Sequence, residues 1–571
     1  MNDPEKQIFT YLQVSQAAAV VALALLCLVQ SPTAFADDDA DFRPGNLLVS
    51  RVVYDNNPNN IVAGVTLLPP GCVGSACTSA TASGAYPSVW NNVLVDGSFG
   101  ITSRIVLDQM TRLGLLISTL EVPNSSQRHI AVTSDQMVGS FSSKSEVALN
   151  LSTDKRFVTF MGYLAPIDAI DVSNSNTPFV VDPTNPVSAR NYRVVAQVDQ
   201  HGKFHFTKTN AYSGNNGRAA ILNDNNGASI LYTAGNAGNG GNPQPDGIIV
   251  GAGAQILSAE HKPLGAQMDP GLPTPVGSFS ITQLGFKADK VGKDTNFRGL
   301  TIFNDVVYYT KGSGSNGINT VYFVDTTGFD VNGRPLACPN GIGLPGPAAT
   351  LPTGPIVYNA SLLQTEGVFP YNMCVLNGFT TTLAKNTTTS FPFGVWFANA
   401  TTLYVADEGD GTNTFDPETG TYADAAGQTT AGLQKWIFDN SLGAWKQAYV
   451  LTAGLDLGIP YTVRDYPTGN NPATKLPWSP ATDGLRNLTG RVNRDGTVTI
   501  WAITSTVSGN GDQGADPNKL VMIKDRLAAA ALPGGESFTT IRTARFGEVL
   551  RGVSFTPGTG APEHPDDEDE P

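Results

Sequence analysis

The chain has 571 residues, of which 41% are hydrophobic and only 15% are charged, and it contains 60 glycines and 38 prolines. This composition favours many short strands joined by turns, and it excludes a protein built from long solvated helices. The formal charge of −14 excludes sequence-independent binding of nucleic acid, which needs a basic surface, so we expect no nucleic-acid partner.

The first 36 residues have the layout of a secretory signal peptide. The uninterrupted apolar run Ala17 to Val29 is followed by the small-x-small sequence Ala34-Phe35-Ala36. A run of this length is too short to span a bilayer. We therefore predict a signal peptide over residues 1–36 and a secreted, extracellular protein, or a periplasmic one in a Gram-negative bacterium, with no stable membrane span after cleavage.

Four cysteines remain after the predicted cleavage, and an even number in an exported chain suggests disulfides. Of the three possible connectivities, the most economical one joins neighbours in the sequence. It pairs Cys72 with Cys77 and Cys338 with Cys374.

Six segments share one pattern, in which an apolar run enters a polar turn and returns as a second run rich in β-branched or aromatic residues. These segments are Ser145 to Tyr163, Asn216 to Gly235, Asn296 to Gly312, Phe391 to Gly409, Gly484 to Ser505 and Val549 to Gly558. Such a repeat is typical of a β-propeller. We predict an all-β, six-bladed β-propeller as a single domain over residues 37–560. The uneven spacing leaves a seventh blade possible.

The two ends of the chain are expected to close the ring. Val549 to Phe555 has the pattern of an innermost strand without a partner, whereas Asn46 to Tyr54 and Ser103 to Pro123 resemble outer strands without an innermost one. Pairing these segments would complete one blade and remove exposed sheet edges. The acidic and proline-rich residues 561–571 are predicted to form a disordered tail.

Long loops are expected on one face of the ring, where each innermost strand begins and where the second strand of a blade leads into the third. They include Asn56 to Asp96 and Glu408 to Thr430. Because rigid scaffolds present binding residues on such loops, we expect any binding site on this loop-rich face.

An arginine stands immediately before the expected innermost strand in four of the six copies. The four residues are Arg218, Arg298, Arg486 and Arg551, and the remaining two copies carry Glu146 and Phe393. Guanidinium groups gathered at a central mouth would hold a carboxylate, sulfate or phosphate, so the sequence predicts an anionic ligand there. The alternative is that each arginine pairs with an acidic loop residue of a neighbouring blade, such as Asp407, Glu408 or Asp483, and stabilises the ring.

The loop between residues 407 and 416 gathers Asp407, Glu408, Asp410 and Asp416. Calcium takes six to eight oxygen ligands, so this loop is a candidate Ca²⁺ site. A solvated acidic loop is the alternative.

The arginine-glycine openings, the Asn/Asp hairpins and second strands such as Thr402 to Asp407 (TLYVAD) resemble those of extracellular NHL-type and gluconolactonase-like six-bladed propellers. The resemblance covers nearly the whole mature chain. In the lactonase-like enzymes it implies a central divalent ion held by Glu, Asp and Asn. Glu146 and Asn487 could occupy such positions here, whereas arginines fill most of the equivalent ones.

Two classes of function follow. The first is a secreted binding or scaffold protein whose partner is an extracellular glycan, small molecule or protein. The second is a secreted enzyme, either a calcium-dependent lactonase or esterase-like hydrolase, or a uronate lyase. In the lyase an arginine would neutralise the uronate and Tyr309 or Lys311 would act as the base.

Overall fold

The structure is a computed structural model. It describes residues 41–89, 100–131, 135–141, 146–178, 187–236, 253–259, 274–275, 296–312, 317–324, 341–352, 373–386, 390–510 and 513–560. The predicted signal peptide, the predicted acidic tail and Cys338 lie outside these residues and stay predictions. No helix within these ranges is long and apolar enough to cross a membrane.

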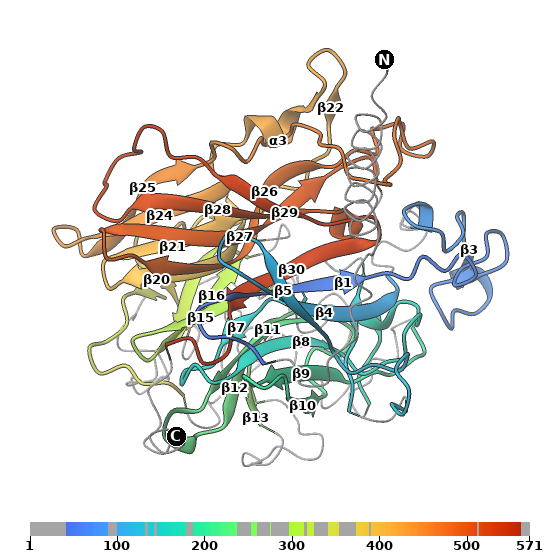
Figure 1. The fold of residues 1–571 in the computed structure, drawn as a ribbon, viewed down its shortest axis with the longest axis horizontal. Coiled ribbons are helices and arrows are strands. Elements are labelled where there is room, and N and C mark those ends of the chain that lie inside the picture. The colour runs from blue at the N-terminus through green and yellow to red at the C-terminus, as the bar shows by residue number, and fades with distance from the viewer. Residues whose placement is uncertain are drawn as a thin grey trace, which may run out of the picture. The chain divides into compact units, whose positions relative to one another are not determined.

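The chain forms six sheets of four or five strands, one for each predicted blade (Figure 1). Blade 1 contains β30 (Glu548–Phe555), β1 (Leu47–Val53), β4 (Thr102–Met110) and β5 (Leu116–Glu121), with β6 (Gly139–Ser140) against β4. Blade 2 contains β7 (Asn150–Leu151), β8 (Val158–Tyr163), β9 (Arg193–Val198) and β10 (Phe204–Thr209). Blade 3 contains β11 (Gly217–Asn223), β12 (Ile230–Gly235), β13 (Ala254–Ser258) and β14 (Thr274–Pro275).

Blade 4 contains β15 (Gly299–Phe303), β16 (Val306–Lys311), β17 (Thr320–Val324), β19 (Met373–Leu376) and β18 (Ile342–Gly343). Blade 5 contains β20 (Pro392–Asn399), β21 (Thr402–Asp407), β24 (Gly432–Asp439) and β25 (Ala444–Leu451). Blade 6 contains β26 (Ala481–Val492), β27 (Thr497–Val507), β28 (Lys519–Arg526) and β29 (Thr539–Thr543). The connecting loops contain β2 (Leu67–Leu68), β3 (Thr78–Ser79), β22 (Phe415–Asp416), β23 (Thr421–Tyr422), α3 (Ala423–Gly427) and four short 3-10 turns, η1 (Gly74–Ala76), η3 (Val172–Asn174), η4 (Asn225–Gly227) and η6 (Gln513–Ala515).

The innermost strands contact one another in a closed circle that runs β7, β11, β15, β20, β26, β30 and back to β7. The predicted six-bladed propeller is therefore confirmed, and the described residues form no seventh blade. The predicted closure is confirmed too, because β30 pairs antiparallel with β1, with Phe555 opposite Leu47 and Glu548 opposite Val53. One blade is thus built from both ends of the propeller (Figure 1).

Each blade packs between two others, so the middle strands bury both faces. Every residue of β8, β12, β16 and β17 is buried. The outer strand β5 has no buried residue. The continuous apolar runs of the sequence are therefore strands covered on both sides, as expected for sheets stacked around a ring.

The innermost strand of blade 2 is shorter than predicted, since the sequence pattern began at Ser145. In the structure β7 covers only Asn150–Leu151. Val147 has a φ of 63°, a left-handed conformation that interrupts a strand and is unusual for a β-branched residue. The segment still reaches the axis, and the Val147 amide donates a 3.2 Å hydrogen bond to the carbonyl oxygen of Met161.

One of the two predicted disulfides is confirmed. Cys72 and Cys77 are bonded across a loop, with their Cα atoms 5.3 Å apart. The second pair includes Cys338 and stays a prediction.

Glycines in the innermost strands allow neighbouring blades to approach backbone to backbone. A Cβ atom on Gly299 would lie 2.4 Å from the carbonyl oxygen of Phe393, and one on Gly552 would lie 2.7 Å from that of Val147. Real Cβ atoms do not come this close to backbone oxygens. The glycine of the arginine-glycine openings is therefore required by the packing of the ring.

Replacing Gly299 with Ala is expected to lower the free energy of unfolding by about 1–3 kcal/mol, because the added methyl group overpacks the contact between blades 4 and 5. Gly534 is the matched control, since a Cβ atom there meets nothing within 4 Å. Urea unfolding monitored by tryptophan fluorescence measures both variants. Equal stability of the two would show that the close approach at Gly299 does not constrain the ring.

Candidate functional site

The four predicted arginines lie at one level of the innermost strands, and they are buried. Their exposed fractions are 5% for Arg218, 8% for Arg298, 5% for Arg486 and 4% for Arg551. Only Arg298 immediately precedes its strand, as predicted. Arg218, Arg486 and Arg551 stand inside β11, β26 and β30, because these strands begin earlier than the sequence pattern indicated. In β26 the pairing with β27 shifts register twice between Thr482 and Leu488.

Two of the arginines share one carboxylate. Glu408 follows β21 of blade 5, and its Oε1 atom lies 3.3 Å from Nε of Arg298 of blade 4. Its Oε2 atom lies 3.2 Å from Nε of Arg486 of blade 6. Burial lowers the pKa of Arg298, and the charge of Glu408 offsets part of this effect. A single glutamate therefore joins three consecutive blades, which is the geometry of the structural alternative.

The other two arginines donate hydrogen bonds to main-chain oxygens of the segments that lead into the next blade. Arg551 donates to the carbonyl oxygen of Phe141. Arg218 donates to the carbonyl oxygen of Phe297 at 2.7 Å and to the side chain of Asn296. Burial lowers the pKa of Arg218, and the nearby charge of Arg298 lowers it further. These contacts bind each arginine to the segment that leads into the next blade.

Glu146 and Asn487, the candidates for a central divalent ion, are engaged by protein donors. Glu146 accepts hydrogen bonds from the Tyr163 hydroxyl, from Nδ2 of Asn216 at 2.9 Å and from the amide of Ser140 at 3.1 Å. Asn487 accepts a 2.6 Å hydrogen bond from the amide of Val553. These oxygen atoms are therefore engaged by donors within the ring.

The acidic loop does not gather its four carboxylates around one point. Asp407 is buried and accepts hydrogen bonds from the amide of Phe391 and the hydroxyl of Ser390, both at 2.7 Å. Glu408 binds the arginines, while Asp410 and Asp416 lie toward the surface of the loop. Within the described ranges no three His, Cys, Asp or Glu residues are placed to hold a metal ion.

Burial raises the pKa of Asp407 to about 7. Asp483 of blade 6, which is also buried, has its pKa raised by burial to about 7. Gln428 donates a 2.6 Å hydrogen bond to Asp483. Both carboxyl groups are almost completely buried and accept hydrogen bonds from the surrounding loops.

Tyr309 and Lys311 do not lie where a base could reach a substrate. Both belong to β16, and neither has any exposed surface. Nζ of Lys311 donates a 2.8 Å hydrogen bond to Oδ1 of Asn319, and burial raises the pKa of Tyr309 well above its ordinary value. The two residues are two apart in β16, so their side chains lie on the same covered face of the sheet.

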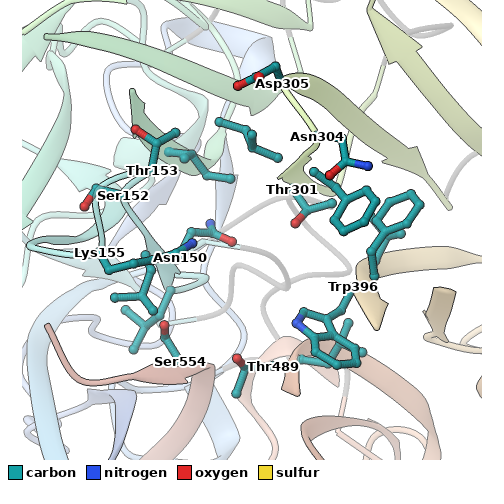
Figure 2. A pocket seen from close by; sticks show the side chains of 18 of the residues that line it. Asn150, Ser152, Thr153, Lys155, Thr301, Asn304, Asp305, Trp396, Thr489 and Ser554 are labelled. Carbon is teal, nitrogen blue, oxygen red and sulfur yellow. The ribbon is translucent and has the colours of Figure 1, made fainter. Parts of the chain in front are cut away.

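A cavity of about 390 Å³ lies around the axis beyond the level of the arginines, toward the end of the ring at which the innermost strands finish. Figure 2 shows side chains that line it. The innermost strand of every blade contributes to its lining. One lining residue from each of blades 1 to 6, in that order, is Ser554, Asn150, Ile221, Thr301, Trp396 and Thr489. We call this cavity the axial pocket.

The axial pocket and the arginines are linked by a repeat in the sequence. Thr301, Thr489 and Ser554 each stand three residues after an arginine, in the segments RGLT, RNLT and RGVS. The arginine at the first position of this repeat was predicted to be functional, whereas the hydroxyl residue at the fourth position was not. At the arginine level the side chains are almost completely buried. Three residues further along, Thr301, Thr489 and Ser554 line the pocket together with larger residues such as Ile221 and Trp396.

Several polar atoms of the axial pocket are without a partner in the part of the chain that the structure describes. None of the described residues forms a hydrogen bond with the hydroxyl groups of Thr301, Thr489 and Ser554 or with the indole N–H of Trp396. Nδ2 of Asn150 donates to the carbonyl oxygen of Ala220 at 3.2 Å. Figure 2 shows these side chains around one central space.

Few charges face this space. Lys155 and Asp305 are the ionisable residues among those that line it. Burial lowers the pKa of Lys155, and the nearby Asp154 counteracts this effect. The lining therefore combines one cation and one anion with hydroxyl, amide and aromatic groups.

The sequence predicted a binding site on the loop-rich face, whereas the axial pocket lies at the other end of the ring. Several loops of that face, among them residues 237–250, 313–316 and 511–512, lie outside the described residues. A site formed by those loops stays a prediction.

Comparison with protein families finds no matching family, and comparison with curated proteins finds no relative. Among solved structures, the chain resembles an ulvan lyase of a new polysaccharide lyase family, bound to -[GlcA(1-4)Rha3S]-, with 10% identity, a TM-score of 0.29 and coverage of 88% of this chain and 96% of that chain. A second structure of an ulvan lyase matches with 10% identity, a TM-score of 0.28 and coverage of 90% and 97%. At these scores the likeness says nothing about the activity of this chain.

Proposed function

We propose that this protein is a secreted β-propeller that binds a polar, uncharged small molecule, or one unit of an extracellular glycan, in the axial pocket. One observation carries the proposal. Hydroxyl groups from three different blades and the indole N–H of Trp396 converge on one cavity without partners in the described protein. Concave sites that combine apolar walls with a few convergent polar groups are the usual form of a small-molecule site.

The lining favours binding over catalysis. General acid–base chemistry needs ionisable groups positioned on the reacting atoms. The axial pocket offers Lys155 and Asp305 for this purpose, and both belong to its turns rather than to its innermost strands. Secretion follows from the signal-peptide layout of residues 1–36.

The arginine level supports a structural role better than an anion-binding role. Each arginine is at most 8% exposed, and Arg298 and Arg486 share Glu408. An anionic ligand would have to displace Glu408 or the main-chain carbonyls from these groups. We therefore propose that the arginines hold the blades together and that the ligand enters from the opposite end.

The test uses a panel of sugars, polyols, sugar acids, amino acids and nucleosides, screened by thermal unfolding and followed by calorimetry. A ligand present at about 100 times its Kd stabilises the folded state by about 2.7 kcal/mol, so a true binder raises Tm clearly. Thr489→Val keeps the shape of the side chain and removes one hydroxyl. We expect it to weaken binding of the best panel member by about 1 kcal/mol.

The matched control is Thr539→Val, the same exchange on the exposed outer strand β29. It is expected to leave the affinity unchanged. A panel without any binder, or a binder whose affinity is the same in wild type and Thr489→Val, would contradict a site in the axial pocket.

A further inference from the structure

We infer that the axial pocket recognises the terminal ring of a neutral saccharide, which enters end-on. This inference rests on the proposed function and adds to it the class of ligand and the direction of entry. Four features of the pocket support the inference: its closed inner end, its aromatic and hydroxyl wall, its volume, and the balance of charge in its lining.

The pocket is closed at its inner end. Below it, the arginine level consists of side chains that are almost completely buried, with exposed fractions of 2% for Phe393, 5% for Arg486, 6% for Glu408 and 8% for Arg298. An open tunnel along the axis would expose these groups to solvent. A ligand therefore enters and leaves by one mouth, and a long chain cannot pass through. Such a site accepts the end of a glycan rather than an internal segment.

The wall of the pocket is part aromatic and part hydroxyl. Phe303 and Phe397, which both line the pocket, are stacked with ring centroids 4.6 Å apart. Trp396 lies on one side of the space (Figure 2). The opposite side carries Asn150 and Ser554 (Figure 2). A pyranose ring has the same two characters, since its C–H groups pack on aromatic surfaces and its hydroxyl groups point outward.

The pocket hydroxyls without a partner among the described residues also match sugar hydroxyls in their hydrogen-bonding capacity. A serine or threonine hydroxyl both donates and accepts hydrogen bonds, as a sugar hydroxyl does. Ser554 is only 3% exposed, yet its hydroxyl has no partner among the described residues. Its oxygen faces the pocket, where a ligand hydroxyl can form a hydrogen bond with it.

Size and charge narrow the ligand further. The volume of about 390 Å³ is near the lower end of the range of about 300–1,000 Å³ found for ligand pockets. It suits one or two sugar rings rather than a long oligosaccharide. Lys155 and Asp305 carry opposite charges, so the lining provides no net cation to favour a uronate over a neutral sugar.

The experiment is calorimetric titration of the full mature protein with three sets of probes. These are neutral mono- and disaccharides, the corresponding uronic acids, and neutral oligosaccharides of increasing length with the same linkage. We expect a neutral mono- or disaccharide to bind, its uronic acid to bind no more tightly, and affinity to stop rising beyond two rings. Thr301→Val, Thr489→Val and Ser554→Ala are each expected to weaken binding about 5-fold, while Thr539→Val leaves it unchanged.

The possible results distinguish failure of the saccharide inference from failure of the proposed function. Affinity that keeps rising with chain length, or a preference for uronic acids, overturns end-on recognition of a neutral ring. If no saccharide binds but another uncharged panel compound binds and loses affinity in Thr489→Val, the inference fails while the proposed function stands. If no compound binds, both fail. Because three pocket variants are used, misfolding of one of them, visible as a lowered Tm, does not block the test.

Discussion

Glu408→Gln is expected to lower the free energy of unfolding by about 3–5 kcal/mol, because removing one partner of a buried ion pair leaves uncompensated charge in the interior. Glu408 is the shared partner of Arg298 and Arg486, at 3.3 Å and 3.2 Å. The exchange removes the charge and nearly preserves the shape. Both guanidinium groups then remain buried beside a neutral amide.

The control is Glu418→Gln, the same exchange in an exposed turn of blade 5. It is expected to change the stability by less than about 0.5 kcal/mol. Denaturant unfolding of both variants at low and high salt measures the effect. A loss below 1 kcal/mol for Glu408→Gln would mean that the stability of the ring does not depend on this carboxylate. It would favour an anion-binding role for the arginines.

Asp525→Asn is expected to cost up to about 3–5 kcal/mol, because it removes the nearest counter-charge of the buried Lys435 ammonium group and leaves only the Glu536 carboxyl group nearby. Nζ of Lys435 in blade 5 lies 3.0 Å from Asp525 in blade 6, and neither side chain is exposed. Tyr404 and Tyr449 donate hydrogen bonds of 2.5 Å and 2.7 Å to the same carboxylate. A buried lysine, an aspartate and two tyrosines resemble a catalytic cluster, but here they connect two blades.

The matched exposed pair is Lys524 with Asp495 at 2.7 Å, where both side chains are 55% exposed. Asp495→Asn is expected to cost less than about 1 kcal/mol, since exposed ion pairs contribute little. The same unfolding measurement compares the two variants. Equal small losses would show that Asp525 is not needed to neutralise Lys435.

The propeller and its closure could be predicted from the sequence because they depend on patterns that repeat. The unpaired run Val549 to Phe555 and the outer strands near residue 50 predicted the pairing of β30 with β1. The recurring arginine marked the level at which the innermost strands meet. Its structural alternative named Glu408 as a partner, and Glu408 does bind two of the arginines.

The axial pocket could not be predicted in the same way. Serine and threonine occur throughout this chain, so the fourth position of the RGLT, RNLT and RGVS segments carries no signal by itself. It becomes meaningful only when six innermost strands are superimposed and the sizes of their side chains are compared level by level. The interior direction of Tyr309 and Lys311 was hidden for a related reason, since a strand buried on both faces has no polar side.

Another residue that the sequence did not reveal is Arg193, which has no exposed surface. Its guanidinium group donates to the carbonyl oxygens of Asn191 and Ser175, each at 2.8 Å, and lies over the ring of Tyr163. Burial lowers its pKa to about 9. Main-chain acceptors come from loop conformation, so no pattern of acidic residues could have indicated them.

The central claim is that ligand binding and ring stability belong to opposite ends of the axis. Calorimetric titration of wild type, Thr489→Val and Glu408→Gln with the best neutral saccharide, at a temperature where all three are folded, tests it directly. The account predicts weaker binding in Thr489→Val at unchanged stability, and wild-type affinity in Glu408→Gln despite its lower stability. Loss of affinity in Glu408→Gln, together with wild-type affinity in Thr489→Val, would contradict it.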